Sequence, residues 1–263
     1  YELNNGQSGL GCADGASNSV TCNAAWSRNS IDNPMYPAMG STISLSMTLT
    51  PPFSVWNDED YNDLPNSEKY LWQEYNKWMF DSKFYLPLDS KKKLVIEAKA
   101  HFGFIGSYTD KVGIGPFERF FIGGDGLAGG FNSFLLGQEV IGLRGYENNA
   151  ITPPNYGRTR QDPNTIEGGI VYNKFGLELR YPVTTGNAAT IYGFVFTEAG
   201  NNWNNYQDFN PFNLYKSAGF GARIFMPAFG LIGLNWAYGF DKLPYSNDIS
   251  GSQFHFTIGQ QLR

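Results

Sequence analysis

The side chains of this sequence that could do covalent chemistry do not form a recognisable catalytic group. The 263-residue chain has only two histidines, His101 and His255, far apart and each in a strand-like segment. We find no serine–histidine–aspartate order and no zinc-ligand spacing. The stretch Gly124–Gly129 matches the glycine pattern of dinucleotide sites, but that pattern has meaning only between a strand and a helix. We therefore expect no enzyme, no catalytic residue, no cofactor and no metal.

The longest connection in the sequence, about 105–168, carries residues with a more specific arrangement. A segment of that length is too long to be a passive loop. It contains the glycine-rich stretch Phe120–Leu127 and, further on, Arg144 within Leu143–Glu147. A guanidinium held inside a fold needs an acidic partner, and its planar fork suits a carboxylate. The question is therefore which elements surround this arginine.

The composition argues against a helical membrane protein and against a nucleic-acid partner. Only 16% of the residues are charged, against roughly 25% in a typical soluble domain, and there are 21 Phe, 16 Tyr, 6 Trp and 31 Gly. Mean hydropathy is −0.34, and no apolar run reaches the roughly 18 residues of a membrane helix. The net charge is −5. These features fit a β-barrel with an apolar outer face, although composition alone leaves a soluble β-sandwich open.

Strict alternation of apolar and polar residues is the main structural signal. In 41–50, for example, Ile43, Leu45, Met47 and Leu49 alternate with serine and threonine, which places them on one face of a strand. Most such segments have about ten residues, as bilayer-crossing strands do, whereas soluble strands average about five to six. Nine segments have this character: 18–29, 41–50, 77–88, 94–104, 169–183, 188–200, 215–227, 231–240 and 254–259.

The connections between these segments alternate between short and long. Short turns on one side and long loops on the other are the rule for outer-membrane barrels, and a sandwich has no reason to sort its loops in this way. Nine is an odd number, so this chain alone should not close, and we expect the missing strands on the N-terminal side. The short links are 31–40, 89–93, 184–187 and 228–230, and the long ones are 51–76, 105–168, 201–214 and 241–251.

Several motifs resemble the BamA superfamily of outer-membrane insertases and polypeptide transporters. Leu143-Arg144-Gly145-Tyr146 resembles the V-R-G-F/Y motif of that family, and the preceding glycine-rich stretch resembles its F-x-x-G-G segment. The resemblance covers nearly the whole chain in order and corresponds to about the eighth to the sixteenth strands. It continues in the turn Asn33–Ser41, the strand Leu177–Pro182, the stretch Phe196–Gly200 with Glu198 in place of aspartate, and the closing strand Gln253–Gly259.

The resemblance implies a place for the arginine motif. In the family this motif lies at the tip of the sixth extracellular loop, which folds back into the barrel, where the arginine meets acidic side chains. Alternation places Glu178 on one face with Lys174 and Arg180, which should be the barrel interior. We therefore predict that Arg144 bonds Glu178 and also Glu198. The face of Glu198 carries aromatic side chains as well, at Tyr192, Phe194 and Phe196.

The final strand has a second implied role. In the family it pairs with the first strand and forms a seam that opens toward lipid, a role that falls here on Phe254, Phe256, Ile258 and Gly259. Gly259 matches a position where the family strand kinks, and a small residue facing a crowded interior is an equal alternative. The chain ends at Arg263 rather than at the aromatic residue usual in the family. Cys12 and Cys22 could form a disulfide or remain thiols, and the spacing does not decide.

The expected fold is all-β: one domain over 1–263, comprising about nine C-terminal strands of a sixteen-stranded, transmembrane, antiparallel up-and-down β-barrel. The resemblance implies the central insertase of β-barrel assembly in the Gram-negative outer membrane. The implied partners are unfolded barrel clients, accessory lipoproteins, the lipid bilayer and POTRA domains outside this chain. A polypeptide secretion pore of the same superfamily and an ordinary porin are the alternatives.

Overall fold

A computed structural model describes residues 2–3, 15–57, 60–61, 63–126, 138–151, 153, 168–186, 189–226, 230–244 and 246–258. Its main feature is one nine-stranded antiparallel sheet, in which the strands follow each other in chain order. The predicted all-β, up-and-down arrangement is confirmed. The strands are β3 (Cys22–Asn29), β4 (Gly40–Leu49), β5 (Asn76–Pro87), β6 (Val95–Gly106), β9 (Val171–Thr185), β10 (Thr190–Trp203), β11 (Tyr215–Met226), β12 (Gly230–Lys242) and β13 (Ile249–Ile258).

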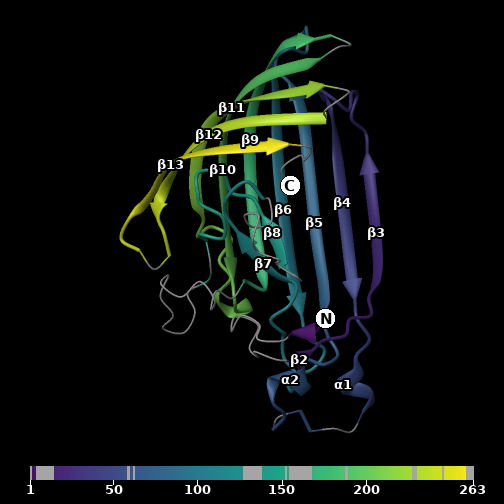
Figure 1. Cartoon of the computed structure of the whole chain (residues 1–263). Coiled ribbons are helices and arrows are strands. Elements are labelled where there is room, and N and C mark those ends of the chain that lie inside the picture. The colour runs from purple at the N-terminus through teal and green to yellow at the C-terminus, as the bar shows by residue number, and fades with distance from the viewer. Residues whose placement is uncertain are drawn as a thin grey trace.

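The sheet curves around a hollow and remains open (Figure 1). Among the described strands, β3 and β13 each have a neighbour on one side only. The two faces differ sharply in chemistry: on β9, Leu177 points to the convex side and is 52% exposed, whereas its neighbour Glu178 is 1% exposed. Apolar side chains outside and charged side chains inside reverse the order of a soluble protein. This distribution suits a sheet whose convex face contacts lipid.

The connections lie at the two ends of the sheet as the alternation predicted, with one exception. Short links join β3 to β4, β5 to β6 and β9 to β10 at the top of Figure 1, whereas loop 51–75 lies at the bottom and the link between β12 and β13 lies at the left. The connection expected at 241–251 is reduced to residues 243–248, because β12 and β13 extend into it beyond a register shift after Gly239. Loop 51–75 contains the short helices α1 (Phe53–Trp56) and α2 (Asn66–Lys69), and η3 (Tyr206–Asp208) follows β10.

None of the helices in the described ranges is long and apolar enough to cross a membrane. Two small strand pairs lie outside the main sheet. The first is antiparallel, between β1 (Glu2–Leu3) and β2 (Gly15–Ala16). The second is parallel, between β7 (Arg119–Ile122) and β8 (Gln138–Ile141), and lies in the hollow of the sheet (Figure 1).

The connection between β6 and β9 therefore enters the concave side rather than leaving it. Its apolar side chains form a core with the wall: Phe120 packs edge-on against Tyr172 of β9, with ring centroids 4.6 Å apart. Burying such aromatic and aliphatic side chains contributes roughly 1.5–3 kcal/mol each. The fully buried loop residues of this core are Phe120, Ile122, Ile141, Leu143, Tyr146 and Ile151.

The turn between β3 and β4 is stabilised by the Asp32 side chain and by the backbone conformation of Gly40. The Asp32 carboxylate accepts N–H bonds from Ala38 and Met39 at 2.9 and 3.2 Å. Partial burial alone would raise the pKa of Asp32, but these N–H groups outweigh it and hold the pKa below its usual value. Gly40 follows with φ +105°, and a Cβ there would lie 2.2 Å from the carbonyl oxygen of Ser30. Only glycine fits this position.

We expect Gly40→Ala to destabilise the barrel by more than about 1 kcal/mol, because alanine strains at positive φ and meets the Ser30 backbone. The measurement is the midpoint of urea unfolding in detergent micelles. Gly186→Ala, in the turn after β9, is the matched control, since its Cβ would come no closer than 3.8 Å to a neighbour. Equal midpoints for the two variants would contradict the expectation.

Candidate functional site

Arg144 lies buried against the inner wall of the sheet, between the two predicted carboxylates. Its Nη2 is 2.7 Å from Glu178 Oε1 and 2.7 Å from Glu198 Oε1. Its backbone N–H donates to the other oxygen of Glu198 at 3.0 Å, and Nη1 donates to Asn235 Oδ1 at 3.3 Å. The structure thus brings together all three residues that the sequence singled out, and Glu198 holds both the main chain and the side chain of the arginine.

Glu178 is the centre of a larger ionic cluster on the same wall. It accepts from Arg180 Nε at 3.0 Å, from Arg223 Nη1 at 3.0 Å and from Lys99 Nζ at 3.1 Å. Arg180 also pairs with Glu97 on β6. Because these groups are withdrawn from water, each needs its partners to offset the cost of desolvation. The cluster joins three carboxylates, Glu97, Glu178 and Glu198, to five cations, Lys99, Arg144, Lys174, Arg180 and Arg223.

Aromatic rings complete the surroundings of the guanidinium groups. The Arg144 Cζ lies 3.5 Å from the ring centroid of Phe196 and 5.7 Å from that of Phe194. Arg223 lies 4.4 Å from Phe194 in turn. A cation over an aromatic face is attracted by the ring quadrupole, by about 2 kcal/mol or more where water is excluded. The aromatic residues that share a face with Glu198 therefore belong to the arginine site.

The residue after the arginine is held by the last strand. Gly145 donates its N–H to Nε2 of His255 at 3.0 Å and accepts from Ser250 Oγ at 2.7 Å. A Cβ at Gly145, which has φ +89°, would lie 2.9 Å from Ser217 Cβ. Tyr146 donates to the carbonyl of Lys216 on β11 at 2.7 Å. The four-residue motif therefore contacts every strand from β9 to β13.

Phe254, Phe256 and Ile258 of the predicted seam lie on β13. Phe254 and Phe256 point to the convex face and are 68% and 47% exposed. Ile258 ends the described part of β13, where it is paired with Ile232 of β12. Gly259, and with it the predicted kink, lies outside the described residues, as does Cys12, while Cys22 is exposed on β3.

The sequence did not single out several residues of the site. His255 and Ser250 hold Gly145, and Lys99 and Arg223 bind Glu178. A partial signal existed, because each of these charged residues lies on the polar face of an alternating strand. Which polar residues meet across strands depends on register and on how deep the loop enters, and neither is visible in an isolated strand pattern.

We expect Glu178→Gln to lower the free energy of unfolding by about 3–5 kcal/mol, because three arginines and a lysine lose their shared carboxylate. Glu68→Gln, at an exposed position of helix α2, is a control outside the cluster. Glu198→Gln should cost less, since Arg144 keeps Glu178. Chemical denaturation in micelles measures all three. A cost for Glu178→Gln no larger than for the control would show that the cluster does not stabilise the fold.

We expect His255→Phe to weaken the docking of the loop on the inner wall by about 1–3 kcal/mol of free energy, because the Gly145 N–H is left buried without an acceptor. His255→Gln, which keeps an acceptor oxygen, should retain most of the docking. Trypsin cleavage after Arg144 reports the undocked loop, so the phenylalanine variant should be cut faster than the glutamine variant at equal stability. Identical cleavage rates would refute a docking role for His255.

Comparisons with known proteins agree with this architecture. The family model described as the Omp85 superfamily domain matches residues 4–262. Among solved structures, the chain is similar to BamA from Haemophilus ducreyi lacking POTRA domains 1–3, with a TM-score of 0.59 and 21% sequence identity. The match covers 89% of this chain and 41% of that one, so the chain spans about two fifths of its length. The likeness in structure shows the fold, and the family match over almost the whole sequence shows that this chain belongs to the Omp85 superfamily.

Proposed function

We propose that this chain is the C-terminal part of the barrel of an outer-membrane insertase, which folds other β-barrel proteins and inserts them into the Gram-negative outer membrane. The observation that carries the proposal is the loop motif bound to the inner wall and to β13, the strand at the edge of the sheet. An unpaired edge offers backbone donors and acceptors to an incoming strand. This is β-augmentation, and it requires no covalent chemistry, cofactor or metal.

The partners follow from this role. Unfolded outer-membrane barrel proteins are the clients, and the convex apolar face of the sheet contacts the lipid bilayer. The Haemophilus ducreyi protein has POTRA domains, and we infer that such domains, with the remaining strands, belong to the rest of this protein. Accessory lipoproteins would bind there as well. None of these partners requires a site for nucleic acid.

The position of the loop argues against the porin alternative. A porin needs a water-filled channel, whereas here the loop core and the ionic cluster occupy the concave side beside β9 and β10. A polypeptide secretion pore of the same superfamily would share the arginine motif. The insertase and the secretion pore differ in their substrates, so the decisive experiment measures the fate of other barrels.

The test is depletion of the full-length protein in its own host. An insertase predicts that unrelated barrel proteins disappear from the outer membrane together, and that re-expression restores them. If only a secreted polypeptide is lost and the other barrels assemble normally, the chain belongs to a secretion pore. Re-expressed Arg144→Ala should restore assembly severalfold less well than wild type at equal abundance, because the loop loses its anchor. Arg28→Ala, on the exposed strand β3, is the matched control and should restore it fully.

A further inference from the structure

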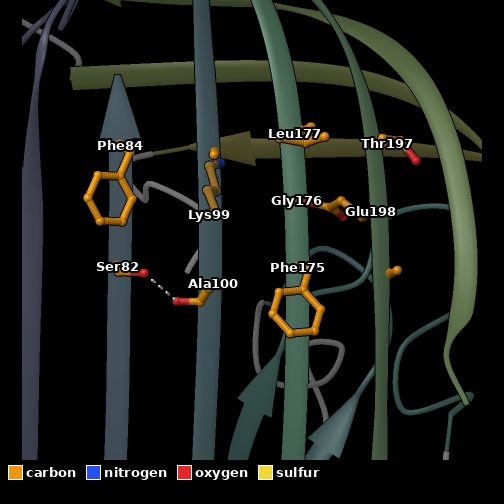
Figure 2. Close-up of a pocket in the computed structure, with 11 residues that line it drawn as sticks. Ser82, Phe84, Lys99, Ala100, Phe175, Gly176, Leu177, Thr197 and Glu198 are labelled. Atoms are coloured by element: carbon orange, nitrogen blue, oxygen red, sulfur yellow. Dashed lines mark hydrogen bonds between the residues drawn. The ribbon is translucent and has the colours of Figure 1, made fainter. Parts of the chain in front are cut away.

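The convex face of the sheet carries an apolar groove, whose lining also includes Lys99 and Glu198 of the ionic cluster. It has a volume of about 470 Å³ and lies over β5, β6, β9 and β10. In Figure 2, Lys99, Gly176 and Glu198 lie between two rows of residues. Strand register pairs Ala98 with Phe84 and with Leu177, and these three form one row. Ser82, Ala100 and Phe175 form the next row, further from the short turns. The two alanines leave a trough along β6, and the large side chains on β5 and β9 form its walls.

A cluster of positive charge lies at one end of the same strands. The turn between β5 and β6 exposes Lys91, Lys92 and Lys93. None of the three ammonium groups forms an ion pair with a carboxylate in the described part of the chain. The Nζ of Lys92 contacts the sulfur of Met39 at 3.0 Å, and its charge helps to lower the pKa of Asp32. The adjacent Asp89 carboxylate accepts backbone N–H bonds at 2.7 and 2.8 Å within the turn. The lysines are therefore available to an external anion.

The distance between the groove and the lysines matches one leaflet of a bilayer. Seven residues separate Ala100 from Lys93, which is about 23 Å along a strand at ~3.3 Å per residue. A strand tilted by about 40° rises roughly 18 Å along the membrane normal over that length. Half of the hydrocarbon core is about 15 Å thick. If the trough lies near the bilayer centre, the three lysines lie at the headgroups.

We propose that this face binds one anionic glycerophospholipid of the leaflet on the short-turn side. One acyl chain lies in the trough along β6, and the phosphate contacts Lys91, Lys92 and Lys93. The inference rests on the membrane orientation of the proposed function but not on insertase activity. The trough alone would accept an acyl chain of any lipid. The lysines select anionic lipids, since each lysine near a membrane surface strengthens the binding of anionic lipid about fivefold.

Native mass spectrometry of the full-length protein tests this. The protein is released from micelles containing equal phosphatidylglycerol and phosphatidylethanolamine, and the retained lipid is counted. We expect one phosphatidylglycerol, retained in preference to phosphatidylethanolamine. The triple variant K91Q/K92Q/K93Q should lose that preference, whereas Lys216→Gln, at the opposite end of the sheet, should keep it. Because the three lysines are exposed, we expect the triple variant to keep the fold.

The groove is tested separately. Ala98→Leu and Ala100→Leu fill the trough and should each reduce retention severalfold, whereas Ala222→Leu on the same face of β11 should not. Equal retention of the two lipids by the wild type, or unchanged retention in both groove variants, overturns the proposal. The measurement contains no client protein, so a failed depletion experiment with selective lipid retention would remove only the insertase function.

Discussion

The structure depends on one buried interaction, the contact of Arg144 with the carboxylates of Glu178 and Glu198. A charge withdrawn from water is tolerated only with its partners in place, so neither the loop nor the wall is stable in this form alone. Glu178 extends the dependence to Arg180 and Arg223, which bind the same carboxylate. The loop, its apolar core and at least three strands of the wall are thus held as one unit by a small set of charges.

Most of the fold was predictable from the sequence because the strands are long and alternate strictly. β6 and β12 show why: each keeps its period of two over more than ten residues, and a slip by one residue would move charges such as Glu97 into lipid. The link between β12 and β13 was predicted too long. Strand pairing continues there across a shift in register after Gly239. The alternation of apolar and polar residues does not predict such a shift.

The site was predictable in its central part only. Arg144 was identified by a motif, and Glu178 by a strand pattern that separates it from Leu177. His255, Ser250 and Lys99 contact the centre through long-range pairing, and their residue types alone do not reveal it. In the sequence, Phe196 and Glu198 lie on the same face of a strand, so this face looked mixed in character. The structure shows that Phe196 packs against the guanidinium of Arg144.

The two hydrogen bonds that β13 makes to Gly145 have a thermodynamic consequence. Since His255 and Ser250 lie on the edge strand, any sideways displacement of β13 pulls on Gly145, and through the adjacent Arg144 on β9 and β10. Linkage makes this effect reciprocal: undocking the loop changes the free energy of displacing the edge by the same amount as displacing the edge changes the free energy of undocking the loop. Gly145 therefore joins the edge of the sheet to the arginine site in the interior.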